Sequence, residues 1–266
     1  MTQAPTTSGS ALQRFQSWAD RLATERPDVP YMAPFMAFLL LLPLNDWLPY
    51  ELRPLALTVR GVLPAFLFWL FRRHYPPLGK PHWTIAIIVG VLVAIGWVVG
   101  QHWLNTIHIG ERSLGGRLFL FPGQPHPHDP RLGPDPEHAA PLSPFSWWLQ
   151  VVLRVGVSAT TVPIVEEIFW RAFLLRAFID WDRFYKLPLG QFAWKAFLIT
   201  SFISIFEHPD NWGVSILCWF VYNGLMYWKK SVLCLILTHG ITNLVLYAWV
   251  AWGGVHSNDA ATAAYY

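Results

Sequence analysis

The segment from Trp83 to Leu104, WTIAIIVGVLVAIGWVVGQHWL, contains no Asp, Glu, Lys or Arg. It is long enough to cross a bilayer, because about 20 apolar residues in a helix span the hydrocarbon core. Ser231 to Trp252 is a second run of this kind. Only 13% of the 266 residues are charged, whereas soluble proteins average about 25%. The sequence therefore predicts a multi-pass integral membrane protein.

Several further apolar segments are predicted to be helical, because a backbone in lipid finds hydrogen-bond partners only within its own helix or in a closed barrel. The predicted spans are approximately 31–48, 53–71, 83–104, 145–179, 190–206, 212–228 and 231–252. The predicted fold class is all-α: a polytopic transmembrane bundle of about seven to eight helices that encloses an active-site cavity within the membrane.

The segment 145–179 fits either one tilted, kinked helix or two spans divided at Pro163, whose ring suits the first turn of a helix. Basic clusters follow the second span, this segment and the sixth span. One net crossing places all three clusters and the N-terminus on the cytoplasmic side, as the positive-inside rule favours. We therefore expect one net crossing, with an extra re-entrant or interfacial stretch as an option.

The chain divides into five predicted regions. Residues 1–29 form a polar tail and an amphipathic interfacial helix, in which Leu12, Phe15, Trp18 and Leu22 share one face. The others are a three-span region at 30–104, an external loop rich in Pro and His at 105–144, a core at 145–252 and a tail at 253–266. We interpret His126, His128 and His138 as parts of a solvated loop rather than a metal site, since proline-rich backbone is extended.

The net charge and the cysteine content of the sequence exclude some classes of binding partner. A net charge of +3 is too small to suggest nucleic acid, so the lipid bilayer is the expected partner. Cys218 and Cys234 lie in apolar segments and are interpreted as small hydrophobic residues. No cleavable signal peptide is visible, because the first apolar run begins near Pro30.

Polar groups inside apolar helices are the candidate functional residues. An ionisable group at bilayer depth costs about 2.5–3.5 kcal/mol on insertion scales. Three groups of this kind stand out: Glu166, Glu167 and Arg171; Glu207 and His208; and His239 and Asn243.

Helical spacing assigns different roles to the two adjacent glutamates. Glu167 and Arg171 are four residues apart and can pair on one face, whereas Glu166 is rotated by about 100°. An unpaired carboxylate in a site of low dielectric constant can act as a general base or acid. His239 and Asn243 also share a face, and they can stabilise an oxyanion.

Structural explanations stand beside these functional ones. His208 precedes a turn and also fits an interfacial histidine, and Glu207 fits an interfacial residue. His239 and Asn243 also fit hydrogen bonds between packed helices. The remaining arginines in the spans, Arg53, Arg60 and Arg154, receive no role, although Arg154 could pair with one of the glutamates.

The motifs resemble those of the CAAX prenyl endopeptidase and bacteriocin-processing family of intramembrane proteases. Glu166-Glu167-Ile-Phe-Trp-Arg171 matches its EExxxR motif, and His239-Gly-Ile-Thr-Asn243 matches its HxxxN motif. The family's FxxxH motif keeps only His208, since Ser204 stands where the aromatic residue belongs. The resemblance covers about residues 145–250.

The resemblance implies a glutamate-dependent hydrolysis of a peptide bond inside the membrane. It implies that Glu166 and His208 activate water, that His239 and Asn243 stabilise the oxyanion, and that Glu167 with Arg171 supports the site. We expect no cofactor and no metal; zinc held by Glu166, His208 and His239 is the minority alternative, because the chain lacks a close ligand pair such as HExxH.

The function predicted from the sequence is therefore an intramembrane endopeptidase, a hydrolase related to the CAAX prenyl proteases. Its expected substrate is a membrane-bound or lipidated peptide or protein. A proton-coupled transporter and a non-catalytic scaffold or immunity-type protein are the alternatives. The transporter is disfavoured because the chain shows neither an inverted repeat nor a matched pair of broken helices.

Overall fold

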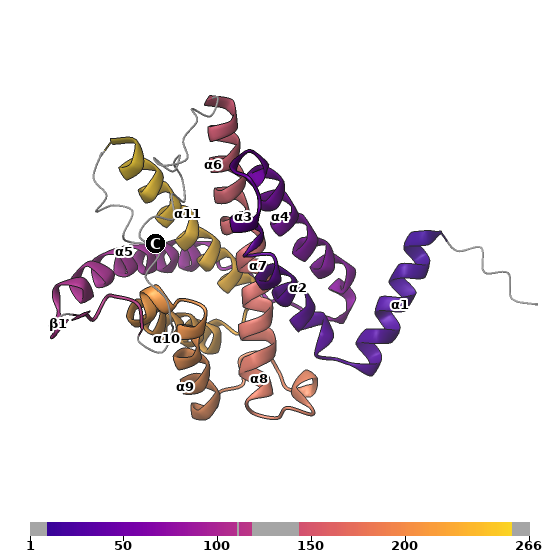
Figure 1. Ribbon diagram of the computed structural model, residues 1–266. Coiled ribbons are helices and arrows are strands. Elements are labelled where there is room, and N and C mark those ends of the chain that lie inside the picture. Colours follow the sequence, from indigo (N-terminus) through magenta and orange to yellow (C-terminus); the bar gives the residue numbers. More distant parts are fainter. Residues whose placement is uncertain (1–9, 111, 119–143, 257–266) are drawn as a thin grey trace, which may run out of the picture.

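The computed structural model describes residues 10–110, 112–118 and 144–256. Within these ranges the chain is all-α, and its one sheet is a hairpin of two short antiparallel strands, β1 (His108–Ile109) and β2 (Arg112–Ser113). The fold class predicted from the sequence is confirmed (Figure 1). The expected tail 1–9, most of the proline-rich loop with His126, His128 and His138, and residues 257–266 lie outside the described residues.

The helices follow one another along the whole described chain. The α-helices are α1 (Ala11–Glu25), α2 (Val29–Leu40), α3 (Leu44–Trp47), α4 (Arg53–Leu70), α5 (Trp83–Thr106), α6 (Pro144–Ala159), α7 (Thr161–Glu167), α8 (Leu175–Ala177), α9 (Trp194–Ile203), α10 (Trp212–Lys229) and α11 (Val232–His256). A π-helix, η3 (Ile168–Leu174), joins α7 to α8. The 3₁₀ helices are η1 (Tyr50–Leu52), η2 (Arg72–His74), η4 (Phe184–Lys186), η5 (Ser204–Phe206) and η6 (Pro209–Asn211).

Four helices of the described ranges are long and apolar enough to cross a membrane. They are Arg53–Leu70, Trp83–Thr106, Trp148–Ala177 and Val232–Trp249. The expected span 31–48 is wrong as a single helix, because α2 ends at Leu40 and α3 begins only at Leu44, after Pro43. The expected spans 190–206 and 212–228 do not meet the same criterion of length and hydropathy, and the first is a short apolar helix, Trp194–Phe206. The orientation of the N-terminus stays a prediction.

The long segment 145–179 forms one candidate span, Trp148–Ala177. The α-helical path breaks at Thr160 (φ −124°, ψ −69°), three residues before the expected division. Pro163 lies in the first turn of α7, where its missing N–H is not needed. A single kinked helix therefore fits, and the kink lies one and a half to two turns before Glu166.

Close helix contacts hold α11 in the bundle. A Cβ atom on Gly90 of α5 would lie 2.7 Å from the carbonyl oxygen of Thr238, and one on Gly240 would lie 2.6 Å from that of Ala159. Small residues let membrane helices approach closely enough for such backbone contact. The second contact holds α11 against the break between α6 and α7, where His239 contacts Glu167 and Asn243 bonds the carbonyl oxygen of Ser158.

Polar contacts between helices place the segment that carries His208. Asn223 of α10 donates hydrogen bonds to the hydroxyl oxygens of Thr200 (2.9 Å) and Ser201 (3.0 Å) of α9. The Ser215 hydroxyl donates to that of Ser204 at 3.0 Å. Ser204 stands at the position of the missing aromatic residue, so a buried hydroxyl pair takes the place of aromatic packing there.

Helix α1 extends away from the bundle (Figure 1). It begins with a capping box in which Ser10 and Gln13 exchange side-chain and backbone hydrogen bonds. Leu12, Phe15 and Trp18 are exposed, and Gln16 donates to the carbonyl oxygen of Leu70 at 3.0 Å. The amphipathic helix expected at residues 11–24 is confirmed as a helix, and its position on the membrane surface stays a prediction.

The contact between α1 and η2 is expected to weaken in acid. A hydrogen bond of 2.8 Å to His74 lowers the pKa of Asp20 below its ordinary value of 3.8. A lowered pKa in the docked state means that this stabilisation is present above pH 3.8 and is lost as the pH falls through the lowered pKa. The protection factors of the α1 amides, which are the ratios of the intrinsic to the observed hydrogen-exchange rates, should therefore fall in acid.

The expected fall in the protection factors is below about tenfold, because exposed pairs contribute about 0–1 kcal/mol and the Asp20 side chain is 37% exposed. Asp20→Asn should show the lower protection factors already at neutral pH and should lose this pH dependence. Equal pH profiles for the two proteins would show that this pair does not hold α1.

Candidate active site

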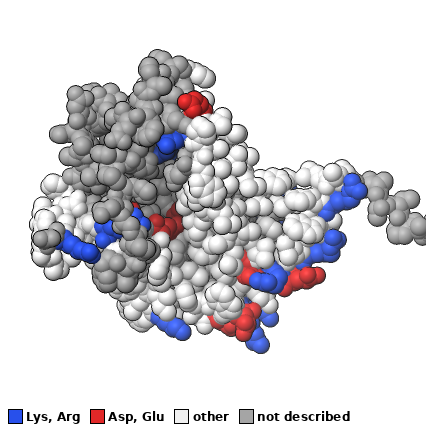
Figure 2. Space-filling model, viewed as in Figure 1, with Lys and Arg blue, Asp and Glu red and all other residues white. Residues whose placement is uncertain are grey.

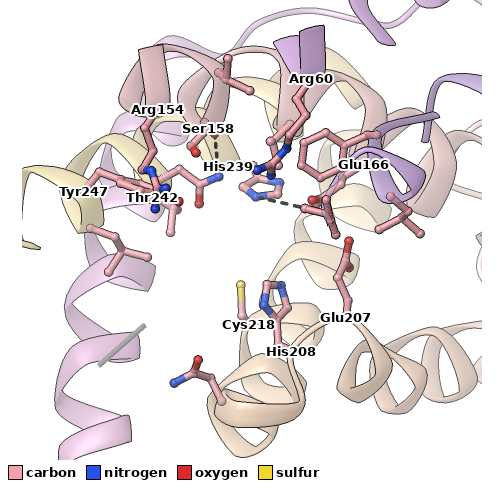
Figure 3. Close-up of a pocket in the computed structure, with 18 of the residues that line it drawn as sticks. Arg60, Arg154, Ser158, Glu166, Glu207, His208, Cys218, His239, Thr242 and Tyr247 are labelled. Atoms are coloured by element: carbon pink, nitrogen blue, oxygen red, sulfur yellow. Dashed lines mark hydrogen bonds and ion pairs between the residues drawn. The ribbon is translucent and has the colours of Figure 1, made fainter. Parts of the chain in front are cut away.

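A cavity of about 450 Å³ lies between α4, α6, α7, α10, α11 and the turn after η5. Figure 2 shows acidic and basic side chains together in a hollow near the centre of the view, in addition to charged patches on the outside of the molecule. Four of the predicted site residues line the cavity: Glu166, His208, His239 and Asn243. In Figure 3, Glu166 and His239 lie at one end, and Glu207 and His208 rise from the other. Residues from segments far apart in the sequence thus meet in one polar cavity.

Glu167 connects the motif on the α7–η3 segment to the motif on α11. One carboxylate oxygen, Oε1, accepts a hydrogen bond from Arg171 Nη1 at 3.1 Å and contacts His239 Nδ1 at 2.8 Å. Glu167 and Arg171 have no solvent-exposed side-chain surface. The predicted pair with Arg171 is confirmed, and Glu167 also positions His239, a contact between residues 72 positions apart.

Arg171 is a buried cation whose surroundings are mainly aromatic. Its guanidinium carbon lies 4.8 Å from the ring centre of Trp219 and 5.3 Å from that of Tyr222. Its Nε and Nη2 atoms have no hydrogen-bond partner among the described residues. Aromatic faces attract a desolvated guanidinium, so these rings and the Glu167 carboxylate together compensate its burial. The π-helix that carries Arg171 belongs to a type of distortion that is frequent at functional sites.

The contact with Glu167 sets the orientation of the His239 ring. A carboxylate only accepts hydrogen bonds, so we assign a hydrogen to Nδ1. Nε2 then faces Glu166, whose Oε2 is 3.8 Å away. Glu166 is 5% exposed. Helical spacing predicted that Glu166 lies outside the arginine pair, and the structure places its carboxyl group outside that pair and beside the His239 imidazole.

Asn243 is positioned by the kink in the long helix. Its Nδ2 donates to the carbonyl oxygen of Ser158 at 2.8 Å, drawn as a dashed line in Figure 3. Ser158 lies in the last turn of α6, where carbonyl groups lack partners within the helix. The amide nitrogen of Asn243 carries two hydrogens, so one remains for a ligand in the cavity.

His208 enters the cavity between two indole rings. The centres of Trp97 and Trp219 lie 5.4 and 5.6 Å from the centre of the imidazole, both in edge-on arrangements. The turn that carries His208 begins where η5 ends, and Pro209 follows immediately. The tryptophans therefore fix a ring at the end of a helix, where the backbone alone would leave it mobile.

Several other residues that line the cavity received no functional role from the sequence. Glu207 points toward Glu166 (Figure 3), although we interpreted it as interfacial. Arg53, Leu57 and Arg60 line the cavity from one face of α4, and Arg154 does so from α6. The spacing of residues 53, 57 and 60 is the helical signal that could have shown a polar face turned inward.

The possible metal ligands do not gather closely. Across the residues that the structure describes, no group of three or more His, Cys, Asp and Glu side chains has the geometry to hold a metal ion. Glu166, His208 and His239, the expected minority zinc set, share the cavity without forming such a group.

Comparison with known proteins supports the motifs. Residues 146–245 match the family model described as Type II CAAX prenyl endopeptidase Rce1-like. No curated protein and no solved structure matches the chain. The match covers α6 to α11, which contain all the motif residues, and four apolar helices are able to span the membrane. Over residues 146–245, this integral membrane protein is therefore similar to the type II CAAX prenyl endopeptidases.

Proposed function

We propose that this protein is a glutamate-dependent intramembrane endopeptidase that cleaves a membrane-bound or lipidated peptide. The observation that carries the proposal is the shared cavity of Glu166, His208, His239 and Asn243, with the buried Glu167–Arg171 pair behind it. Peptide hydrolysis needs a base for water and donors for an oxyanion. These four side chains supply both.

Water activation is assigned to Glu166 and His208. Glu166 has one carboxylate oxygen, Oε2, that is buried and lacks a hydrogen-bond partner. Such an oxygen can accept a proton from a water molecule held between the two ends of the cavity. His208, fixed between Trp97 and Trp219, orients that water from the opposite end. Attack of the water on the scissile carbonyl then produces a tetrahedral oxyanion.

Stabilisation of the oxyanion is assigned to His239 and Asn243. With a hydrogen on Nδ1 donated to Glu167, His239 needs a second hydrogen on Nε2 to act as a donor. The imidazolium then belongs to a set of four charges, Arg171, Glu167, His239 and Glu166, that sums to zero. Asn243 adds its second amide hydrogen. Donors that are held in place before reaction avoid reorganisation when the charge develops.

The cavity also has an apolar side that suits a membrane-associated substrate. Phe38, Leu39 and Leu42 line it from the end of α2, where Leu40 is 79% exposed. A lipidated or hydrophobic segment can bury apolar surface there while its peptide bond lies between the polar groups. The proposal therefore concerns a substrate that arrives from the bilayer.

The direct test is a comparison of membrane proteomes from cells that carry the wild-type protein or Glu166→Gln. Uncleaved precursors should accumulate only with the variant, and expression of the wild type should restore their processing. A matched substitution at an exposed glutamate of α1, Glu25→Gln, should leave processing unchanged. Identical proteomes, together with proton-coupled uptake by the purified protein in proteoliposomes, would contradict the proposal and favour a transporter.

Hydrolysis is expected to be independent of a metal ion. Incubation with 1,10-phenanthroline followed by dialysis should change the cleavage rate by less than about twofold, because the proposed base and oxyanion donors are all side chains. A chelator-sensitive rate that zinc restores would show that Glu166, His208 and His239 rearrange to bind metal when substrate enters.

A further inference from the structure

Glu207 is a buried carboxyl group in the cavity to which the proposed function assigns no role. Both of its carboxylate oxygens are buried and lack a hydrogen-bond partner. The polar groups that face it are the Glu166 carboxyl and the indole of Trp170. A merely interfacial glutamate would turn its carboxylate to water, because an unpaired buried charge is costly. Glu207 instead points into the site.

The two facing carboxyl groups have complementary needs. Oε2 of Glu166 lacks a partner, as do both oxygens of Glu207. Two carboxylates that face each other in a buried site repel. One proton held between them removes this repulsion and forms a hydrogen bond that uses one oxygen of each group. The same principle gives paired carboxyl groups in other hydrolases one acid and one base.

Other charged and titratable groups line the same cavity or lie directly behind it. They are Arg53 and Arg60 of α4, Arg154 of α6, Glu167 of α7, Arg171 of η3, Cys218 and Tyr222 of α10, His239 of α11 and His208 next to Glu207. Glu167 and Arg171 neutralise each other as an ion pair. The arginines of α4 and α6 that line the cavity cannot supply a proton, since a guanidinium stays charged.

We propose that Glu207 is a second catalytic carboxyl, which holds a proton shared with Glu166 and donates it to the leaving amine nitrogen. This inference rests on the proposed peptidase function and extends it. It assigns the base to Glu166 and the acid to Glu207, two carboxyl groups that face each other in the cavity. An amide needs such an acid, because its nitrogen leaves only after it is protonated.

The protons balance over one turnover. Water forms a bond to the carbonyl carbon and loses one proton to Glu166. The tetrahedral oxyanion collapses, the C–N bond breaks, and the nitrogen takes the proton of Glu207. The products are a carboxylic acid and an amine. The proton on Glu166 then passes to Glu207, which restores the starting state without another reactant.

The test compares two probes cleaved by the full-length protein in nanodiscs. The first is a quenched fluorescent peptide with a farnesylated cysteine next to the scissile amide. The second replaces that amide with an activated phenyl ester, whose phenolate leaves without a proton. Glu207→Gln should lower kcat for the amide by about 10²-fold or more, the usual range for general acids, and leave KM unchanged. It should leave ester cleavage within about threefold of the wild type, because no acid is required there.

Glu166→Gln separates this inference from the proposed function. It should abolish cleavage of both probes, because both need activated water. Amide cleavage by Glu166→Gln at the wild-type rate would contradict the glutamate-dependent mechanism of the proposed function. Loss of cleavage in Glu166→Gln, with Glu207→Gln equal to the wild type on both probes or equally impaired on both, would overturn only the role of Glu207.

Two further measurements keep the test valid if Glu207→Gln is poorly folded. Glu207→Asp keeps the acid on a shorter side chain, so it should recover part of the amide activity. The infrared band of a protonated carboxyl in the wild type should disappear in Glu207→Gln and also in Glu166→Gln, because each variant ends the sharing of the proton. A band that persists in Glu207→Gln would show that the two groups titrate independently.

Discussion

Glu166→Gln is expected to lower the rate of peptide cleavage by at least about 10³-fold while the protein still inserts and folds. General base catalysis contributes about 10²–10⁴-fold, and an amide of nearly the same shape cannot accept the proton of water. KM should stay within about threefold, because the substitution keeps the volume of a side chain that is 5% exposed. The measurement is steady-state cleavage of the farnesylated peptide in nanodiscs.

Two controls separate loss of chemistry from loss of fold. Glu25→Gln makes the same change on the exposed face of α1 and should keep the wild-type rate. The thermal unfolding midpoint of Glu166→Gln should stay close to that of the wild type, because the amide keeps the volume of the side chain and a hydrogen-bonding oxygen beside His239. A stable Glu166→Gln protein that cleaves at the wild-type rate would contradict the glutamate mechanism.

Local spacing predicted the parts of the site that lie within one helix. Glu167 and Arg171 are four residues apart, so their contact follows from helix geometry, and it is present at 3.1 Å. The single span through 145–179 followed from the distribution of basic residues, and Trp148–Ala177 has that form. The ion pair depends only on residues that are close in the sequence, and the number of crossings depends on the charge and hydropathy of whole segments.

Contacts between segments that are far apart in the sequence could not be predicted from helical spacing. The link from Glu167 to His239 joins residues 72 positions apart, and it depends on how Gly240 packs against Ala159. Glu207 looked interfacial because it follows the last apolar turn of its helix, but the tertiary fold turns that end toward Glu166. The span predicted at 31–48 was wrong for a local reason. The apolar composition is continuous there, but the helix ends at Leu40, before Pro43.

The second large effect is expected from Arg171→Met. Removal of one partner of a buried ion pair leaves an uncompensated charge and costs about 3–5 kcal/mol. Here the charge left behind is that of Glu167, whose side chain has no exposed surface. The free energy of unfolding, measured by steric trapping in bicelles, should fall by that amount. Arg14→Met, the same change on the exposed face of α1, should alter it by less than about 0.5 kcal/mol.

The double variant Glu167→Gln/Arg171→Met distinguishes lost pairing from lost packing. Removing both charges leaves no unpaired ion, so the double variant should be more stable than Arg171→Met alone. Its activity should nevertheless remain low, because the neutral amide that replaces the Glu167 carboxylate holds the His239 imidazolium less firmly. The double variant would then recover stability without recovering activity. The reason is that one oxygen atom of Glu167 both pairs with Arg171 and orients His239. A double variant as unstable as Arg171→Met would instead show that the guanidinium stabilises the fold mainly through Trp219 and Tyr222.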